Sequence, residues 1–370
     1  MAQRLIIHVD LDYFYAQCEE NANPSIRGKP VVVCVYSGRT SDSGVVSTSN
    51  YEARKYGVKG ATTIVTAKRL LASTEAIFLP MNRSLYDAVS ERIMGILRDY
   101  GDLFEKVSID EAYLDVSESS KVDYAIAEMM GRKIKETILR KEQITCSVGI
   151  APNKLLAKLA SDHTKPDGLT IVRPDEVHSF LHSQEVNRIP GVGKKVEEKL
   201  NAFNVRTIDD LSRINPIALQ EMFGRSLGTY LYLAARGEDN EPVQEKEMPT
   251  QISRIGTLKE NTRDLDSIRP ILSELTQSLV EKLQDEQISC KSVSIIAILS
   301  NLAIHSRSRT IESSAIDVQT IDECAQQLLK EFLESTPQAI LRRIGVKVTG
   351  LSRPSGQTNI QSFFSTDLSR

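Results

Sequence analysis

The stretch Ser108-Ile109-Asp110-Glu111-Ala112 places two adjacent carboxylates inside an apolar, strand-like run that extends from Phe104 to Val116. A third acid, Asp10, ends the apolar run that begins at Leu5. A buried, ionised carboxylate costs several kcal/mol unless hydrogen bonds or a cation compensate it. Mg²⁺ in phosphoryl-transfer sites is commonly held by one or two carboxylates, water and substrate phosphates. The three acids therefore predict a divalent metal site, although a capped strand end would explain Asp10 alone.

Length and composition favour a globular protein of two or three domains. The chain has 370 residues, of which 41% are hydrophobic and 26% are charged, and domains usually contain about 100–200 residues. Apolar runs stay well short of the ~20 residues that span a bilayer. The start of the chain is too short and too soon acidic for a signal peptide. We expect an intracellular, cytoplasmic protein with no membrane partner.

Cysteine usage and net charge give weaker information. The five cysteines are scattered and include no C-x-x-C pair, so they predict core thiols rather than a disulfide framework or a zinc site. The net charge is −3, whereas nucleic-acid-binding proteins are often basic overall. Any nucleic-acid partner must therefore be argued from local patches of charge.

The first half of the chain alternates strand-like and helical segments. Alternation of this kind around the three acids predicts an α+β sheet with helices on one face. The expected strands are Leu5–Asp10, Pro30–Tyr36, Val45–Asn50, Val107–Val116 (as a hairpin) and Ile144–Ile150, and the expected helices include Ser84–Arg98, Tyr124–Lys141 and Asn153–Ser161.

Residues 174–236 have the pattern of short helices and short loops, and they include Ile189-Pro190-Gly191-Val192-Gly193-Lys194-Lys195. This segment is typical of a helix-hairpin-helix. Gly191 and Gly193 permit a tight turn whose backbone N–H groups can approach a phosphate at the positive end of the next helix, and Lys194 adds charge. An ordinary turn between two helices would use the same residue types.

A polar segment rich in charge, Gly and Pro follows at 236–250 and predicts a linker. From Gln251 onward the order of elements is β-α-β-β-α-β. Strand alternation places Arg307 and Arg309 on one face, and likewise Arg343 and Lys347 on the last strand. A basic sheet face would suit a DNA backbone; solvated strand faces are the alternative.

Four motifs together resemble the Y-family DNA polymerases, and the similarity is closest to the archaeal DNA polymerase IV branch. The resemblance covers residues 4 to 352 in the expected order. The motifs are Asp10-Leu11-Asp12-Tyr13-Phe14-Tyr15-Ala16, Tyr51-Glu52-Ala53-Arg54, Ser108-Ile109-Asp110-Glu111-Ala112-Tyr113-Leu114-Asp115 and Gly149-Ile150-Ala151-Pro152-Asn153-Lys154.

This resemblance implies an α+β multidomain protein with the right-hand architecture of polymerases. It implies a palm of sheet and helices (1–10 and 78–166), small fingers (11–77), a helical thumb with the helix-hairpin-helix (167–235), a linker (236–250), a β-α-β-β-α-β little finger (251–352) and a flexible tail (353–370).

The resemblance also implies the catalytic centre. Asp10, Asp110 and Glu111 would be catalytic and, with the carbonyl of Leu11, would bind two Mg²⁺ ions. Two such cations can stabilise the attacking and leaving oxygens of an in-line displacement. Leu11 stands where relatives often have Phe, and its side chain need not coordinate anything.

Two further acids receive no role. Asp12 and Asp115 lie beside the predicted metal ligands. Turn capping or placement at the surface is sufficient to explain both of them.

For the incoming nucleotide, the resemblance makes Tyr15 a steric gate that excludes the 2′-hydroxyl of ribonucleotides. The triphosphate would be held by the backbone N–H of Phe14 and by Thr48, Tyr51, Arg54 and Lys165, whose hydroxyl, phenol, guanidinium and ammonium groups suit phosphate oxygens. Small residues, Val45 and Ser47, would lie over the nascent base pair. Loose checking of that pair implies low fidelity and translesion synthesis in DNA repair, and we expect no exonuclease domain.

The C-terminal tail contains Gln357-Thr358-Asn359-Ile360-Gln361-Ser362-Phe363-Phe364, which resembles a sliding-clamp-binding peptide. A short helical turn would present Ile360, Phe363 and Phe364 to an apolar pocket while Gln357 hydrogen-bonds beside it. Packing of the tail onto its own domain is the alternative.

The expected partners are primer–template DNA, dNTPs and a sliding clamp, and we expect a monomer. Two rival functions share the three acids: a nucleotidyl cyclase with the same palm, and a non-catalytic DNA-binding protein derived from a polymerase. A cyclase has no use for a helix-hairpin-helix or a clamp peptide. Decay would have removed an acid, and all three are present.

Overall fold

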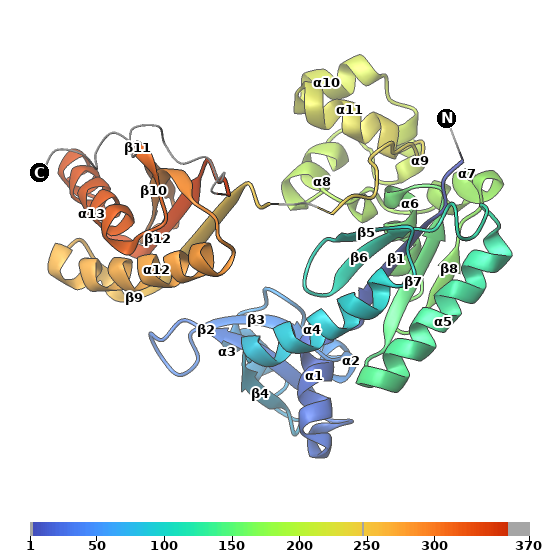
Figure 1. Ribbon diagram of the computed structural model, residues 1–370, viewed down its shortest axis with the longest axis horizontal. Helices are drawn as coiled ribbons and strands as arrows, with labels where there is room; N and C mark the ends of the chain where they lie inside the picture. The colour runs from blue at the N-terminus through green and yellow to red at the C-terminus, as the bar shows by residue number, and fades with distance from the viewer. Residues whose placement is uncertain (1–2, 246–247, 354–370) are drawn as a thin grey trace, which may run out of the picture. The chain divides into compact units, whose positions relative to one another are not determined.

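The computed structural model describes residues 3–245 and 248–353, and these residues form two compact units (Figure 1). Within the described residues, the first unit covers 3–35 and 45–245, and the second covers 36–44 and 248–353. All five cysteines are buried, as predicted for core thiols. No helix within the described ranges is both long and apolar enough to cross a membrane.

A five-stranded sheet of order β5-β6-β1-β7-β8 forms the centre of the first unit. Every residue of β1 and β7 is buried, because helices cover the sheet on both faces. The strands are β1 (Ile6–Leu11), β5 (Leu103–Lys106), β6 (Glu111–Asp115), β7 (Cys146–Ala151) and β8 (Leu169–Ile171).

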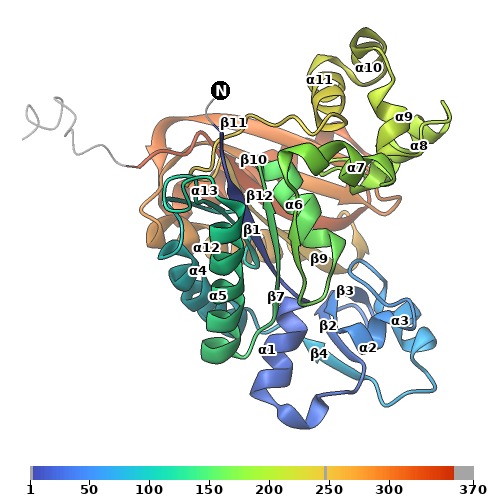
Figure 2. The same ribbon diagram turned by 90° about the vertical axis from the view of Figure 1, so that its right-hand side faces the viewer.

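The prediction of helices on one face only is wrong. Helices α4 (Arg83–Arg98) and α5 (Tyr124–Glu142) pack on one face of the sheet, and α6 (Lys154–His163) packs on the other. Figure 2 shows α5 and α6 on either side of β7. The close approach of α6 requires Gly149, since a Cβ there would lie 2.0 Å from the Ala157 carbonyl oxygen.

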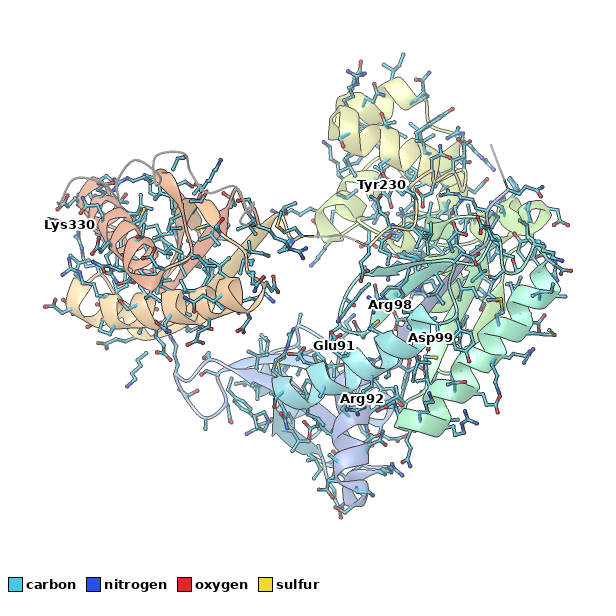
Figure 3. All side chains as sticks on the ribbon, viewed as in Figure 1. Glu91, Arg92, Arg98, Asp99, Tyr230 and Lys330 are labelled. Atoms are coloured by element: carbon cyan, nitrogen blue, oxygen red, sulfur yellow. The ribbon has the colours of Figure 1, made fainter. Side chains whose placement is uncertain are left out.

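An ion pair joins helices α4 and α5. Arg92 of α4 lies 2.7 Å from the Glu142 carboxylate at the end of α5, and Figure 3 labels Arg92 on its helix. The Arg92 side chain is 56% exposed and that of Glu142 12%, and a pair that remains open to solvent on one side contributes on the order of 1 kcal/mol. The buried apolar faces of the two helices, which form one continuous core with β1 and β7, therefore supply most of the stability.

A smaller three-stranded sheet of order β3-β2-β4 lies between β1 and α4 in the sequence. It contains β2 (Val31–Tyr36), β3 (Gly44–Ser49) and β4 (Ile77–Pro80), with helices α1 (Phe14–Ala22), α2 (Tyr51–Arg54) and α3 (Ile64–Leu70). The sequence pattern did not predict β4, whose four residues pair in parallel with β2.

Residues 174–234 form short helices, as predicted, and they share a core with α6. They are η2 (Pro174–Glu176), α7 (Val177–His182), η3 (Val186–Arg188), α8 (Lys194–Asn201), α9 (Ile208–Ser212), α10 (Pro216–Phe223) and α11 (Arg225–Ala234).

The second unit has the predicted element order β-α-β-β-α-β. Its sheet has the order β11-β10-β12-β9, and the apolar faces of the two helices pack on one side of it. The elements are β9 (Gln251–Thr262), α12 (Leu265–Asp285), β10 (Cys290–Leu299), β11 (Ile304–Ala315), α13 (Val318–Ser335) and β12 (Leu341–Thr349).

Candidate active site

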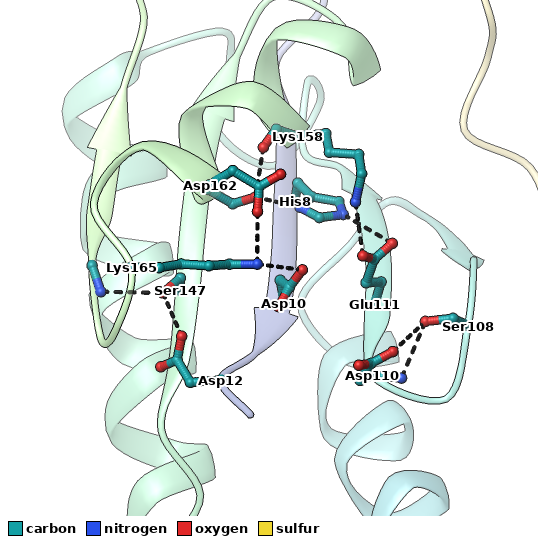
Figure 4. A network of polar contacts seen from close by, with 12 residues as sticks. His8, Asp10, Asp12, Ser108, Asp110, Glu111, Ser147, Lys158, Asp162 and Lys165 are labelled. Atoms are coloured by element: carbon teal, nitrogen blue, oxygen red, sulfur yellow. Dashed lines mark hydrogen bonds and ion pairs between the residues drawn. The ribbon is translucent and has the colours of Figure 1, made fainter. Parts of the chain in front are cut away.

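Pairing of β1 with β6 brings the predicted metal ligands together. Asp10 and Glu111 are direct partners in the antiparallel register, and the Leu11 N–H donates to the Asp110 carbonyl at 2.9 Å. Side chains of directly opposed residues emerge on the same face of a sheet. Figure 4 shows the side chains of Asp10, Asp110 and Glu111 near the adjoining ends of these strands.

Asp110 does not lie within a strand. The apolar run from Phe104 to Val116 breaks at residues 107–110, and this turn is held in place by side chains. The Ser108 hydroxyl donates to Asp110 Oδ1 at 2.6 Å, and the Ser90 hydroxyl of α4 donates to the Ile109 carbonyl at 2.5 Å. The turn keeps the Asp110 carboxylate near enough to Asp10 to raise the pKa of Asp10.

Lysine side chains compensate two of the three carboxylates, those of Asp10 and Glu111. Lys165 Nζ lies 2.7 Å from Asp10 Oδ2 and 2.7 Å from Asp162 Oδ1, and Lys158 Nζ lies 2.7 Å from Glu111 Oε1. Figure 4 shows both ammonium groups directed at the acids. Sequence reasoning missed Lys158 and Asp162. Their i, i+4 spacing on a helix adjacent to the last motif was the available signal.

The pKa shifts of Asp10 and Lys165 indicate that additional positive charge would stabilise the ionised carboxylates of this site. Burial raises the pKa of Asp10 to about 7, with Lys165 opposing that shift and Glu111 and Asp110 adding to it. Burial also opposes the charge of Lys165, but the carboxylates of Asp10 and Asp162 outweigh it and raise the pKa of Lys165. One lysine therefore compensates Asp10 only in part, which leaves room for a stronger cation.

The donor set fits a divalent ion that prefers oxygen. The carboxylates of Asp10, Asp110 and Glu111 come from β1, β6 and the turn before β6. Carboxylate oxygens are the hard ligands that Mg²⁺ prefers. Behind them, burial holds the pKa of His8 well below its usual value. His8 Nδ1 contacts the Ser161 hydroxyl at 2.7 Å, and its buried Nε2 has no hydrogen-bond partner in the described residues. A neutral ring at this depth adds no positive charge that would repel a metal ion.

Asp12 is buried, so the prediction that it could lie at the surface is wrong. Its side chain is buried with 1% exposure, and it accepts hydrogen bonds from Thr145 Oγ1 at 3.0 Å, Ser147 Oγ at 2.7 Å and the Asp167 N–H at 2.8 Å. Asp115 does cap a turn, because it accepts the Ser117 N–H at 2.9 Å. Asp12 thus fixes the loop that carries Lys165.

Asp12→Asn should loosen that loop. The amide cannot accept all three hydrogen bonds, and a buried group left unpaired costs about 1–3 kcal/mol. We expect a lower melting temperature and a KM for nucleotide that rises more than kcat falls, measured by thermal denaturation and steady-state incorporation. Asp115→Asn is the matched control and should change neither quantity. A wild-type KM in Asp12→Asn would contradict the assigned role.

Tyr15 lies in the first turn of α1, and the buried side chain of Tyr86 packs against its ring. Its ring stacks on that of Tyr86 at 4.4 Å and 14°, and burial raises its pKa. Tyr86 is fully buried and donates its hydroxyl to Glu19 at 2.6 Å. The Tyr15 ring cannot move back without disturbing this pair. Sequence reasoning missed Tyr86, because a lone tyrosine in an amphipathic helix gives no signal of this contact.

The residues predicted to hold a triphosphate gather around the start of α1 and α2. Tyr13 has a left-handed backbone (φ 36°) and directly precedes α1, and its side chain does not cap the helix. The first N–H groups of a helix, here including that of Phe14, have no partner within the helix. The Arg54 guanidinium lies over the Tyr51 ring at 4.7 Å. Tyr51 packs edge-on against Tyr13 at 5.3 Å.

A buried amide fixes the position of α2. Asn50 Oδ1 accepts the N–H groups of Val31 and Ala53, each at 3.0 Å, and its Nδ2 donates to Glu20 at 2.7 Å. Thr48 lies two residues before it on β3, and Val45 is exposed on the same strand. Thr48, Tyr51 and Arg54 are therefore carried by one rigid segment.

The predicted hairpin of residues 189–195 is present, but one turn of 3₁₀ helix, η3, precedes it in place of a helix. Gly191 has φ +87°, a conformation that side chains disfavour. Gly193 begins α8 with open space where a Cβ would lie. Lys194 is almost fully exposed. Tyr230 of α11 donates its hydroxyl to the Pro190 carbonyl at 2.6 Å and braces the turn; Figure 3 labels it.

In the second unit, the four predicted DNA-contacting side chains do not share one face. Arg307 and Arg309 pair with Ile295 and Val293, whose side chains face the helices. Arg309 accordingly lies 2.7 Å from Glu331 of α13. The four side chains therefore do not form a single basic face, although the two members of each predicted pair do lie on the same face.

The other two basic side chains lie on the opposite, open face of that sheet. Arg343 and Lys347 pair with Ile298 and Ser294, which alternate with the helix-facing residues of β10. The Nε atom of Arg343 is buried without a hydrogen-bond partner in the described residues. The predicted clamp-binding residues Gln357, Ile360, Phe363 and Phe364 lie outside the described residues.

Comparison with protein families gives three matches along the chain. The impB/mucB/samB family matches residues 9–162, its C-terminal domain matches 249–362, and the DNA polymerase-iota thumb domain matches 187–239.

Relatives match over nearly the whole length. A DNA polymerase IV of Nitrosopumilus maritimus is 43% identical, covering 98% of this chain and 100% of its own. A DNA polymerase IV of Saccharolobus solfataricus is 41% identical with the same coverage. Among solved structures, a Y-family DNA polymerase chimera of Dbh and Dpo4 has a TM-score of 0.88 at 39% identity, covering 94% of this chain and 99% of that one. An insertion ternary complex of Dbh DNA polymerase has a TM-score of 0.69 at 39% identity and the same coverage.

Proposed function

Since the chain belongs to the Y family of DNA polymerases, we propose that Asp10, Asp110 and Glu111 use two Mg²⁺ ions to add nucleotides to a primer 3′ end. The protein is a low-fidelity translesion DNA polymerase that uses divalent metal ions and binds primer–template DNA and nucleotide. The observation that carries the metal assignment is the register of β1 and β6, which sets Asp10 opposite Glu111. The carbonyl of Leu11 is the fourth proposed ligand.

Bound ions would activate the primer 3′-oxygen and neutralise the leaving pyrophosphate. The residues of this chain position the reactants. Asp10, which is paired with Lys165 in this structure, would hold a metal ion, and the Lys165 ammonium group would then bind the triphosphate. Arg54, Tyr51 and Thr48 bind the same phosphates from α2 and β3, and the Phe14 N–H binds them from α1. Tyr15 lies under the sugar.

Metal removal tests this assignment. Dialysis of the intact protein against EDTA should abolish primer extension, and Mg²⁺ should restore it with a saturable dependence, because the bound ions would supply the charge stabilisation that the reacting oxygens need. Extension that persists in EDTA would contradict a metal-dependent centre.

For DNA, we propose two contacts with the phosphate backbone. The N–H groups of the hairpin at Gly191 and Gly193 would bind phosphates beside Lys194. In the second unit, Arg343 and Lys347 would do so from the open face of the sheet. Their strand register, which places both side chains on the face away from the helices, supports this contact. Arg307 and Arg309 lie on the face that the helices cover, but their strand, β11, is at the edge of the sheet. They would therefore contact DNA only at that edge.

We also propose a cytoplasmic monomer that is recruited by a sliding clamp through residues 357–364. Deleting residues 357–370 should leave distributive synthesis unchanged and remove stimulation by the clamp, because tethering raises the local concentration of enzyme at the primer end. Processivity assays with and without the clamp measure both effects. A double substitution, Phe363→Ala with Phe364→Ala, should reproduce the deletion. A deletion variant that still responds to the clamp would refute the proposal.

A further inference from the structure

Three side chains that commonly bind metals meet in the helical region of residues 174–234, in a cluster that the polymerase chemistry does not use. His178 and His182 are four residues apart on α7 and so share one face of that helix. Asp209 is on α9, which contacts α7; Figure 2 shows the two helices side by side. One ligand atom from each residue lies within 4.8 Å of the others.

The carboxylate is already oriented toward the imidazoles. Asp209 Oδ1 lies 3.1 Å from His182 Nδ1, while Oδ2 forms an ion pair with Arg213 on the other side. The His178 and His182 rings lie 5.5 Å apart at 33°. Arg213 therefore holds the carboxylate in the way that an outer hydrogen-bond partner orients a metal ligand, and leaves Oδ1 for an ion.

The cluster lines an open cavity of about 470 Å³ between α7, α9 and the end of α11. Asp209 is mostly buried, with 15% of its side chain exposed, whereas His182 is about half exposed. An ion could thus enter from solvent and retain a water molecule in its fourth position. Apolar residues of the two helices, Leu181 and Ile208, form the floor of the cavity.

We propose that His178, His182 and Asp209 bind one Zn²⁺ ion, with water completing a tetrahedral site. Two imidazole nitrogens and one carboxylate oxygen are a common zinc donor set, whereas Mg²⁺ prefers oxygen ligands alone and stays at the catalytic acids. The ion joins α7 to α9 and so closes the segment 183–208, which contains the hairpin. Zinc thereby stabilises the region that carries the hairpin, independently of nucleotide addition.

Calorimetric titration of the full chain with Zn²⁺, in a background of Asp110→Ala and excess Mg²⁺ to suppress binding at the catalytic acids, tests this proposal. We expect one Zn²⁺ per chain and a melting temperature that rises with Zn²⁺ concentration. His178→Gln and His182→Gln should each weaken binding at least tenfold and remove the thermal shift. His305→Gln, in the second unit, is the matched control and should bind as the parent does.

Substitution by Co²⁺ gives a second readout that folding defects cannot imitate, because Co²⁺ in a tetrahedral site with nitrogen ligands absorbs visible light much more strongly than Co²⁺ in an octahedral site with oxygen ligands. His178→Gln is the decisive variant, since its exposed side chain is dispensable for packing. The absence of a bound ion, or equal Zn²⁺ affinity in His178→Gln and the parent, would overturn the proposal.

Discussion

Asp110→Ala should reduce nucleotide addition by roughly 10³-fold or more while duplex binding stays nearly intact. The carboxylate is a proposed ligand of the catalytic ions, and metal ions supply several kcal/mol of transition-state stabilisation, with each 1.4 kcal/mol worth about a factor of ten in rate. Glu111→Ala should behave alike, because Glu111 is the register partner of Asp10. Single-turnover incorporation and fluorescence anisotropy with labelled primer–template measure the two quantities.

The matched control for this pair is Asp99→Ala. Asp99 is exposed at the C-terminal end of α4 and is labelled in Figure 3, so its loss changes the net charge equally without touching the centre. It should extend primers at the parental rate. Parental extension by Asp110→Ala or Glu111→Ala would refute the metal assignment.

Tyr15→Ala should admit ribonucleotides. Because the Tyr15 ring is held against Tyr86 at 4.4 Å, it cannot yield to a 2′-hydroxyl, and its removal opens that space. We expect the preference for dNTP over rNTP in kcat/KM to fall by about two orders of magnitude, the upper range for a pocket that changes by one group. Incorporation of each matched pair of nucleotides opposite one template base gives the ratio.

Tyr15→Phe is the control, since it keeps the ring and should keep the preference. Tyr86→Leu extends the test. Without the Tyr86 ring stacked against Tyr15, the preference for dNTP over rNTP should weaken partially. If Tyr15→Ala rejects ribonucleotides as strongly as the parent, a different residue is the steric gate.

Elements with long, regular periodicity could be predicted from the sequence. The β-α-β-β-α-β order of the second unit was correct because α12 and α13 have clear apolar faces that the sheet buries. The acids of the first unit were found because carboxylates at apolar strand ends conflict with burial. The strand β4 was missed because four residues are too few to show a period.

Features that depend on strand register could not be predicted. Alternation correctly grouped Arg307 with Arg309 and Arg343 with Lys347, but only the pairing of β10 with both strands shows that the pairs lie on opposite faces. The burial of Asp12 is a similar case. Its three donors come from residues more than 130 positions away, and no local pattern contains that information.

The most direct test of the central claim, a lesion-tolerant polymerase that works through Asp110 and its partner acids, is primer extension on an undamaged and an abasic template. The intact chain and Asp110→Ala are compared with Mg²⁺ and dNTPs. Extension of both templates by the intact chain, with none by Asp110→Ala, is the predicted result. Failure of the intact chain to extend either template, or equal extension by Asp110→Ala, would contradict the claim.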